Sequence, residues 1–253
     1  PVLSVITNIG LDHTEFLGTT RTQIAKEKAG IIKGGTPVVV GQKDEETQKV
    51  FEEIALQQSS KLTFVKVQDQ DWETDLKGVY QVQNIQTALT ALACLNDPKI
   101  NLHTIKQGFK NVISNTGLLG RWQIIADSPQ LILDVGHNKE GLSFLVTELQ
   151  KLEFGHLHLI MGFVKGKKVV DLISLFPSEA SFYLSSPKID RAIPPSTLKA
   201  ELTGSSKNID FFPAVIDALN KARSSANTND LILVCGSTFV VAEVLNFIKN
   251  QKV

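Results

Sequence analysis

The chain has 253 residues, of which 42% are hydrophobic and 21% are charged, values that are typical of a soluble globular protein with one or two domains. Basic and acidic residues are equal at 26 each, so no overall charge favours nucleic acid or an anionic membrane as a partner. The sequence contains no apolar run as long as the roughly 18 residues of a membrane span and no evident signal peptide, and its two cysteines lie far apart with no zinc-binding spacing. We therefore expect a cytoplasmic protein.

Strands and helices alternate in the first part of the chain. Strands are predicted at residues 2–7, 37–41 and 62–67, short strands or a hairpin at 70–83, and helices at about 20–29, 45–59, 84–95 and 102–112. Thr20 and Gln23 have the spacing of a capping box, and Gly30 suits the C-terminal end of the same helix.

A second α/β series follows a turn-forming run at residues 114–117, where a domain boundary is predicted. Its predicted strands are 130–134, 157–161, 182–185, 209–212 and 231–235, with helices near 140–152, 168–176, 196–202, 213–224 and 239–250. Strands separated by helices imply a mainly parallel sheet, whose ligands bind at the carboxyl ends of the strands. The chemistry is therefore expected in the loops at 8–18, 135–138, 162–167, 186–195 and 236–238.

The first candidate site combines Asp12 and His13, just past a predicted strand, with Lys28 on the next helix. Ile24, Lys28 and Ile31 fall on one helical face, whereas Lys26 points away. A buried ammonium is costly, so Lys28 must be paired, neutralised or modified. Addition of CO₂ would convert it to a carbamate, an oxygen ligand suited to Mg²⁺. The spacing alone leaves open that Lys28 extends to solvent and that Asp12 and His13 form an ordinary loop.

Further candidate residues lie at predicted helix starts and strand ends. Asn84 opens a predicted helix, where it either caps the helix or offers its amide to a purine. Arg121 follows the predicted boundary and is either a solvated residue or a phosphate ligand. Asp134 and His137 lie between a strand and a helix, where loop hydrogen bonding and a ligand site are both compatible with the pattern.

Taken in order, these motifs resemble the folylpolyglutamate synthase/dihydrofolate synthase family of the Mur ligase superfamily. The blocks that carry the resemblance are Leu-Asp-His at 11–13, Glu-Lys-Ala-Gly-Ile-Ile-Lys at 27–33, Gln-Val-Gln-Asn at 81–84, Gly-Arg at 120–121 and Asp-Val-Gly-His-Asn at 134–138. The resemblance implies that His13 and a carbamylated Lys28 hold Mg²⁺ and that Asn84 contacts the adenine of ATP. It also implies that Arg121 contacts the phosphates, and that Asp134 and His137 face the ribose and phosphates.

The chain departs from the family pattern at several places. Leu119 stands where the family usually has proline, and Val135-Gly136 replaces Gly-Ala. The loop at 165–168 reads Lys-Gly-Lys-Lys where the family often has Lys-Asp-Lys-Asp, so a role for those two acids is not expected here. The Gly-Ser-Thr turn at 236–238 is interpreted as mainly structural.

The implied fold is α/β. Residues 1–116 are expected to form the C-terminal part of a P-loop-type central ATPase domain, and residues 117–253 a Rossmann-like domain with a mainly parallel sheet. The implied reaction uses ATP to join L-glutamate to a folate or dihydropteroate carboxylate through an acyl phosphate, with Lys28, Arg121 and His137 as catalytic residues. The intact enzyme is expected to be a monomer.

The sequence has no Gly-x-x-x-x-Gly-Lys-Ser/Thr phosphate loop, and its first residue is Pro1. From this we expect the chain to be part of a longer protein and to be inactive alone. Two alternatives remain open: a different Mur-type ligase that acts on a cell-wall or cyanophycin-like substrate, and a non-catalytic nucleotide-binding module.

Overall fold

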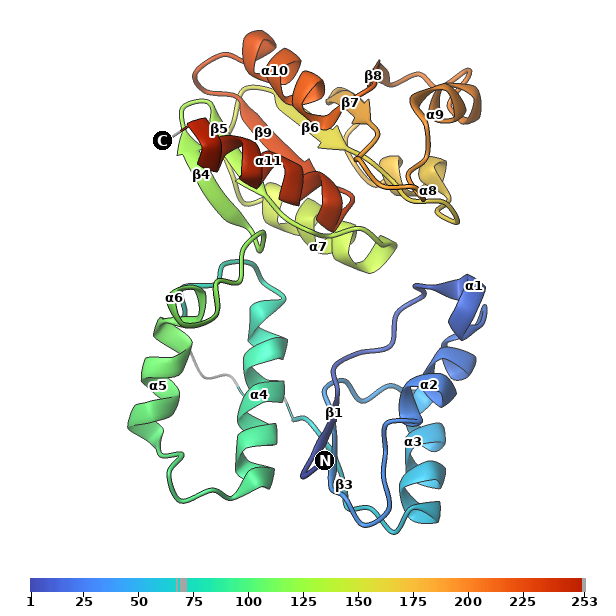
Figure 1. Cartoon of the computed structure of the whole chain (residues 1–253), viewed down its shortest axis with the longest axis vertical. Coiled ribbons are helices and arrows are strands. Elements are labelled where there is room, and N and C mark those ends of the chain that lie inside the picture. Colours follow the sequence, from blue (N-terminus) through green and yellow to red (C-terminus); the bar gives the residue numbers. More distant parts are fainter. Residues whose placement is uncertain (67, 69–71, 252–253) are drawn as a thin grey trace. The chain divides into compact units, whose positions relative to one another are not determined.

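The computed structural model describes residues 1–66, 68 and 72–251. The chain divides into two compact units: unit 1 comprises residues 1–75 and 79–117, and unit 2 comprises residues 76–78 and 118–253 (Figure 1). Within the described ranges, no helix is both long enough and apolar enough to cross a membrane.

Unit 1 is built on a short parallel sheet with the order β1-β2-β3. Its elements are β1 (Ser4–Ile6), α1 (Thr14–Leu17), α2 (Arg21–Ala29), β2 (Val38–Val40), α3 (Glu45–Gln57), β3 (Leu62–Phe64), α4 (Gln81–Leu95), α5 (Leu102–Lys110) and α6 (Val112–Thr116). Ser4 pairs with Val38 and Val38 with Leu62, so the carboxyl ends of the strands lie at one edge. The loops that follow the strands therefore meet at that edge.

Valines of β2 are buried on both faces of this sheet, as the uninterrupted apolar run predicts. Val38 and Val40 pack in one cluster with Ile24 of α2 and Phe51 of α3. Helix α2 begins with the predicted capping box: Thr20 accepts a hydrogen bond from the Gln23 amide, and the Gln23 side chain accepts one from the Thr20 amide. The helix ends at Ala29 with Gly30 as its cap, so both predicted ends are confirmed.

Two predictions for unit 1 differ from the structure. The strand predicted at 62–67 ends at Phe64, and the short strands predicted at 70–83 do not form in the described part of that range. Residues 67, 70 and 71 lie outside the described residues. Gln81 already belongs to α4, because Val79, Val82 and Ile85 recur at every third residue, a spacing that fits the first turns of a helix.

Unit 2 is a sheet with helices on both faces. Its elements are β4 (Gln123–Asp127), β5 (Gln130–Leu133), α7 (Lys139–Leu149), β6 (Leu157–Met161), α8 (Val169–Ile173), β7 (Ser181–Ser185), α9 (Pro195–Glu201), β8 (Asn208–Phe212), α10 (Val215–Ser225), β9 (Leu231–Cys235) and α11 (Thr238–Gln251). Its strand order is β4-β5-β9-β6-β7-β8, and all neighbours are parallel except β4 and β5. The predicted mainly parallel sheet is therefore confirmed.

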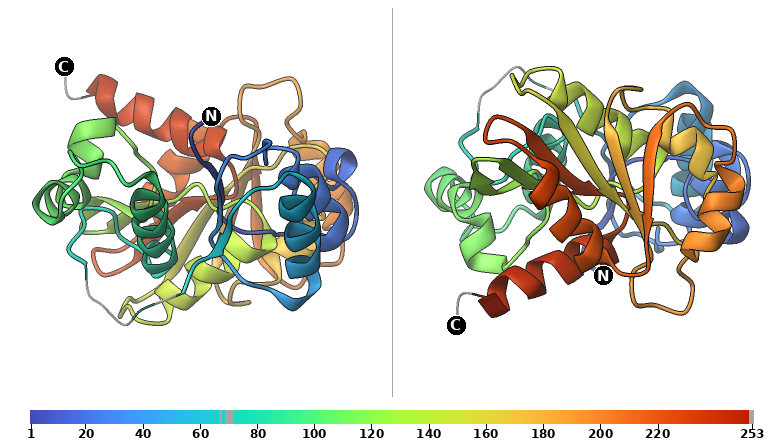
Figure 2. Two further views of the ribbon diagram at one scale, coloured as in Figure 1. Left: turned by 90° about the horizontal axis from the view of Figure 1, so that it is seen from below. Right: turned by 90° about the horizontal axis from the view of Figure 1, so that it is seen from above.

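Alternate side chains of the strands enter two separate clusters. Leu157, Leu159 and Met161 of β6 pack against α7, α8 and α9, whereas Ile160 faces α10 and α11. The right-hand view of Figure 2 shows the yellow-green α7 and the red α11 on opposite sides of these strands. This arrangement leaves the strand-to-helix loops at one edge of the sheet exposed for ligand binding.

Strand β4 was not predicted. It forms an antiparallel hairpin with β5, in which Gln123 pairs with Leu133 and the register shifts between Ile124 and Ala126. The strand has only five residues, and their exposure is mixed. The apolar pattern that would predict a strand from the sequence is therefore weak here. The hairpin places residues 120–122 beside the carboxyl end of β5.

Candidate functional site

In unit 1, helix α2 contacts the loop that follows β1 at two points. The Lys28 ammonium donates a hydrogen bond to the Asn8 carbonyl at 3.1 Å, and Arg21 Nε donates to the Ile9 carbonyl at 3.2 Å. Arg21 also forms an ion pair of 3.0 Å with Asp44, the residue that caps α3. Sequence reasoning did not single out Arg21 or Asp44. Together these contacts fix the backbone between β1 and His13.

His13 occupies an unusual backbone position at the start of α1. Its φ of 52° lies in the left-handed region, which non-glycine residues seldom adopt. Its amide donates to Asp12 Oδ1 at 2.9 Å, and 57% of its side chain is exposed. A left-handed residue held by its neighbour's carboxylate is a strained arrangement of the kind that clusters at functional sites.

Lys28 is half-buried and Lys26 is exposed, as the helical spacing predicts. The predicted third member of the stripe is wrong: Ile31 lies beyond the end of α2 and is 45% exposed, whereas Ile24 is fully buried. The helix stops at Gly30, so the turn that would have carried Ile31 onto the buried face is not formed. Lys28 thus lies at the edge of the apolar face, with its ammonium at the Asn8 carbonyl.

Asn84 lies in the first turn of α4 and is not its cap. The helix begins at Gln81 with Tyr80 as the N-cap residue, and the Asn84 side chain donates to Gln81 Oε1 at 3.0 Å. The neighbouring Gln83 side chain donates to the Gly41 carbonyl, which follows β2. The start of α4, with Asn84 on it, is therefore attached to the carboxyl end of the parallel sheet.

Gly41 permits this attachment by its lack of a side chain. A Cβ at this position would lie 2.3 Å from the Thr7 carbonyl oxygen and 2.7 Å from Thr87 Oγ1. The Gly41 amide also donates to the Ile6 carbonyl at 2.7 Å. The ends of β1 and β2 and the start of α4 thus meet around one glycine.

In unit 2, residues 120–122 form a constrained turn before β4. Gly120 and Trp122 have φ values of 71° and 46°, both left-handed. The Gly120 amide donates to Gln123 Oε1 at 2.9 Å, and its carbonyl accepts from the Val135 amide at 3.0 Å. The Trp122 ring is buried in the core between the sheet and α7.

Arg121 is the half-buried residue at the centre of this turn. Its Nη1 donates to the Gly120 carbonyl at 3.2 Å, so the guanidinium lies next to the backbone of its own turn. A guanidinium has five N–H donors, which leaves others for a ligand. The Arg121 guanidinium is thus held at the carbonyl of the preceding residue.

Asp134 is buried at the end of β5, with only 3% of its surface exposed. Its two carboxylate oxygens accept hydrogen bonds from backbone amides, Oδ2 from Trp122 at 2.7 Å and Oδ1 from Gly136 at 2.8 Å. The carboxylate therefore links the turn at 120–122 to the loop after β5. The motif predicted Asp134 as a site residue but gave no sign of these two contacts.

His137 and Asn138 complete the loop between β5 and α7. His137 Nδ1 lies 3.0 Å from the Val135 carbonyl, and the ring is half-buried. Asn138 caps α7 by accepting from the Gly141 amide at 2.8 Å. The imidazole is thus held through Nδ1 by the backbone of its own loop.

The two basic loops that follow β6 and β7 are joined to each other. Val164 and Ala192 form an antiparallel bridge, and the Lys165 amide donates to the Arg191 carbonyl at 2.9 Å. The Arg191 guanidinium lies over the Phe239 ring of α11, 5.4 Å from its centroid. The loops predicted to hold chemistry in unit 2 thus form one continuous edge.

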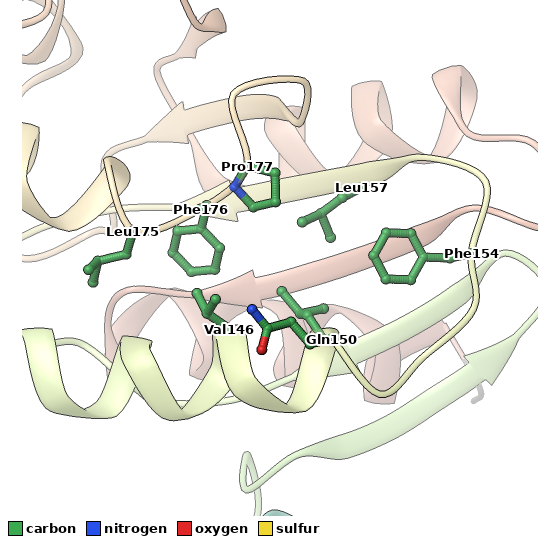
Figure 3. Close-up of a pocket in the computed structure, with 8 residues that line it drawn as sticks. Val146, Gln150, Phe154, Leu157, Leu175, Phe176 and Pro177 are labelled. Carbon is green, nitrogen blue, oxygen red and sulfur yellow. The ribbon is translucent and has the colours of Figure 1, made fainter.

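A small apolar pocket lies at the other end of this sheet. Its volume is about 320 Å³, and Figure 3 shows Phe154, Phe176 and Leu157 around it. Leu157 is the first residue of β6, so the pocket lies at the amino ends of the strands. It is therefore separate from the candidate site in unit 2.

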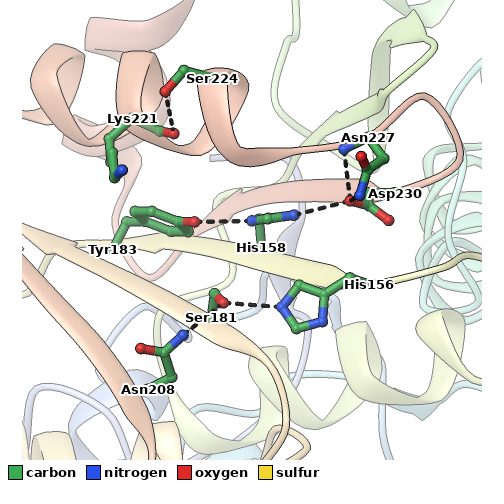
Figure 4. A network of polar contacts seen from close by, with 9 residues as sticks. All are labelled: His156, His158, Ser181, Tyr183, Asn208, Lys221, Ser224, Asn227 and Asp230. Atoms are coloured by element: carbon green, nitrogen blue, oxygen red, sulfur yellow. Dashed lines mark hydrogen bonds and ion pairs between the residues drawn. The ribbon is translucent and has the colours of Figure 1, made fainter.

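A buried polar network also lies towards the amino ends of the strands, and sequence reasoning missed it (Figure 4). His158 Nδ1 is 3.0 Å from the Tyr183 hydroxyl, and its Nε2 is 3.4 Å from Asp230 Oδ2. Burial lowers the pKa of His158, and the hydrogen bond that its ring donates to Asp230 only partly opposes this. Burial alone would raise the pKa of Asp230, but hydrogen bonds from the Asn227 amide and His158 lower it.

This network predicts acid sensitivity of unit 2. Because the pKa of His158 is lowered in the folded state, its ring takes up a proton at a lower pH than in the unfolded chain, where its pKa is about 6.5; stability is therefore full above that pH and is lost as the pH falls below it. We expect unfolding free energy to fall by up to about 1.4 kcal/mol per pH unit below pH 6. Amide hydrogen exchange of β6 and β9 at pH 7.5 and 5.5 measures this change.

The matched variants for this prediction are His158→Gln and His103→Gln, the second of which changes an exposed residue of α5. The first should lose most of the pH dependence between pH 7.5 and 5.5, and the second should keep it. An unchanged dependence in His158→Gln would show that another group controls the acid response.

Within the described ranges, no group of three or more histidine, cysteine, aspartate or glutamate side chains is arranged to hold a metal ion.

In comparisons with known proteins, two family models match successive parts of the chain. The family described as the Mur ligase middle domain matches residues 1–125, and the family described as the Mur ligase glutamate ligase domain matches residues 120–238. The dihydrofolate synthase/folylpolyglutamate synthase of Buchnera aphidicola from Schizaphis graminum is 31% identical over 99% of this chain and 62% of its own length. The chain thus spans about three fifths of that relative.

Solved structures agree with this similarity. Escherichia coli FolC in complex with DHPP and ADP matches 99% of this chain and 62% of its own, with a TM-score of 0.83 and 27% identity. A bifunctional folylpolyglutamate synthase/dihydrofolate synthase with Mn, AMPPNP and L-glutamate bound matches 98% of this chain and 62% of its own, with a TM-score of 0.82 and 27% identity.

Proposed function

Because the chain belongs to the Mur ligase family, we propose that the protein is an ATP-dependent ligase that joins L-glutamate to a folate or dihydropteroate carboxylate. The observation that carries this proposal is the similarity to dihydrofolate synthase/folylpolyglutamate synthase over 99% of the chain. The proposal concerns the complete protein, since those relatives are longer than this chain. Residues 1–116 would supply part of the central ATPase domain, and residues 117–253 the C-terminal domain.

In the proposed reaction, the carboxylate attacks the terminal phosphorus of ATP to give an acyl phosphate and ADP. The amine of L-glutamate then attacks the acyl carbon, and phosphate leaves as the amide forms. Structures of relatives with DHPP and ADP, and with AMPPNP and L-glutamate, support this choice of substrates.

Four residues are proposed to bind the nucleotide. Asn84 would present its amide to the adenine, and it lies on a helix start attached to the sheet. Arg121 would bind phosphate oxygens with the guanidinium donors that its own turn leaves available. His137 and Asp134 would lie on the ribose and phosphate side, in the loop that follows β5.

The divalent metal would be bound by His13 and Lys28. A structure of a relative contains Mn with AMPPNP, which supports a metal–nucleotide pair. Lys28 as an ammonium cannot bind a cation, whereas its carbamate would offer oxygen ligands near the loop that ends at His13. A bound Mg²⁺ would offset phosphate charge. This chain's own residues would orient the phosphates, Arg121 above all.

Direct assay of ligation tests the proposed function. Purified complete protein, ATP, Mg²⁺ and labelled L-glutamate are incubated with dihydropteroate, tetrahydrofolate or a UDP-linked Mur substrate. Incorporation with either pterin supports the proposal. Incorporation with the UDP-linked substrate alone would assign the protein to another Mur-type reaction, and nucleotide binding without incorporation would indicate a non-catalytic module. Size-exclusion chromatography of the same sample tests the proposed monomer, and cell fractionation tests the proposed cytoplasmic location.

A further inference from the structure

The contacts of Asp134 suggest a role that its motif alone does not predict. The motif places Asp134 among residues that face a nucleotide. In the structure its carboxylate is buried, with 3% of the residue exposed, and each of its oxygens accepts a hydrogen bond from a backbone amide. The donors are Trp122, at the turn that carries Arg121, and Gly136, at the loop that carries His137.

We propose that Asp134 is a positioning residue that acts on the nucleotide through Arg121, by holding the turn at 120–122 in its left-handed conformation. This inference rests on the proposed function, because it takes phosphate as the ligand of Arg121. This positioning role differs from direct contact between Asp134 and the ribose.

The turn needs such a restraint because its backbone is strained. Trp122 has a φ of 46°, a backbone conformation that residues other than glycine rarely adopt. It persists only when surrounding contacts enforce it. This conformation lets the Trp122 ring enter the core while Arg121, one residue earlier, remains half-buried at the surface. The short Trp122–Asp134 hydrogen bond of 2.7 Å acts on the amide between these two side chains.

The other contacts of the turn cannot replace this bond. The Gly120 amide is held by Gln123 and the Gly120 carbonyl by the Val135 amide, but both contacts act before Arg121. A Cβ at Gly120 would lie 2.8 Å from Val241 Cγ1, so packing also fixes the turn on that side. After Arg121 the Trp122 ring is held by the core and Gln123 by its pairing with Leu133, whereas the Trp122 amide is held by Asp134, so loss of the carboxylate would release that amide.

Asp134→Asn is the informative variant because its side chain keeps its size, while the charge is lost and one acceptor oxygen becomes an NH₂ donor. An amide offers one acceptor oxygen to two backbone donors, so one of the two hydrogen bonds is lost. Asp127→Asn is the matched control, since it makes the same change at an exposed residue of the same hairpin. Melting temperatures of both variants establish that each is folded.

A double-mutant cycle on the complete protein tests whether Asp134 affects ATP binding through Arg121. ATP affinity is measured for the wild type, Asp134→Asn, Arg121→Ala and the double variant. We expect Asp134→Asn to weaken ATP binding by about tenfold, the order of effect of a lost hydrogen bond to a charged group. In the Arg121→Ala background the same change should cost less than about twofold. Asp127→Asn should match the wild type in both backgrounds.

Nucleotide analogues separate this role from direct contact with the sugar. We expect the ratio of the affinities for ATP and 2′-deoxy-ATP to be the same in Asp134→Asn and the wild type, and likewise for 3′-deoxy-ATP. A ratio that collapses in the variant, or losses that multiply in the double variant, would overturn the proposal in favour of direct contact. Unchanged ATP affinity in Asp134→Asn would also overturn the proposal, and it would count against direct contact as well.

A readout without nucleotide distinguishes failure of the inference from failure of the proposed function. In ¹⁵N spectra, Asp134→Asn should shift the Arg121 and Trp122 amides and speed hydrogen exchange at Trp122, whereas Asp127→Asn should not. Wild-type protein that binds no ATP would refute the proposed function, and the spectra would still decide whether Asp134 holds the turn. Unmoved Arg121 and Trp122 signals would refute the inference even if the ligase is active.

Discussion

Replacing Lys28 with alanine is expected to lower the rate of glutamate ligation by at least about a hundredfold, the order of loss for removal of one preorganised charge-stabilising group. Two features of the side chain support this expectation. It lies half-buried at the end of α2, and its nitrogen touches the loop that leads to His13. Alanine removes both the contact with the Asn8 carbonyl and any carbamate formed on the nitrogen.

Lys26→Ala is the matched control for this experiment, because Lys26 is exposed on the same helix. It should retain near-normal turnover in the same steady-state assay. If Lys28→Ala also turned over normally, the proposed role of Lys28 would be wrong.

Bicarbonate separates a carbamate from a purely structural lysine. Wild-type protein freed of CO₂ should lose activity and regain it when ¹³C-bicarbonate is added, with a carbamate signal in the ¹³C spectrum. Lys28→Ala should show neither effect. Activity that is indifferent to CO₂, with no such signal, would leave only the Asn8 contact as the function of Lys28.

Replacing Gly41 with alanine is expected to destabilise unit 1 by about 3 kcal/mol, at the upper end of the usual cost of overpacking. The new methyl would lie 2.3 Å from the Thr7 carbonyl, a backbone atom that cannot rotate away. Relief requires that β1 and α4 move apart. Because Asn84 lies on α4, ATP affinity should fall with stability.

Gly34→Ala provides the comparison, since the nearest atom to its new methyl is a side-chain oxygen 3.7 Å away. Hydrogen exchange of the β2 amides measures the stability of unit 1 in both variants. Equal exchange in the two proteins would mean that β1, β2 and α4 adjust without cost and would contradict the close approach at Gly41.

The strands of unit 2 were the most predictable part of the fold. The runs at 157–161 and 231–235 are buried at every position, so their boundaries in sequence and structure coincide. A strand covered on both faces needs an unbroken apolar run, and few other elements of that length do. In contrast, β4 is a five-residue segment of mixed exposure, and it forms because it pairs with β5.

The candidate residues were predictable by position but not by contact. The helical spacing correctly separated Lys28 from Lys26, because helical periodicity is a local property. The Asn8 carbonyl beside Lys28 and the Trp122 amide beside Asp134 belong to distant segments, and no local pattern specifies them. Gly41 shows the same limit: a glycine after a strand indicates a turn or a close approach, and only the position of Thr7 decides between them.

The strand order of unit 2 has a consequence for how the protein is made. β9 is the last strand in the chain, yet it lies in the sheet between β5 and β6. Until the ribosome has released Cys235, those two strands have no partner on their facing edges, and both are rich in buried leucine and isoleucine. Completion of the sheet therefore waits until residues 231–235 have been synthesised, and pairings of such large sequence separation form slowly. A nascent chain stalled before residue 231 would expose two apolar strand edges at once. We therefore expect this unit to bind a chaperone during synthesis.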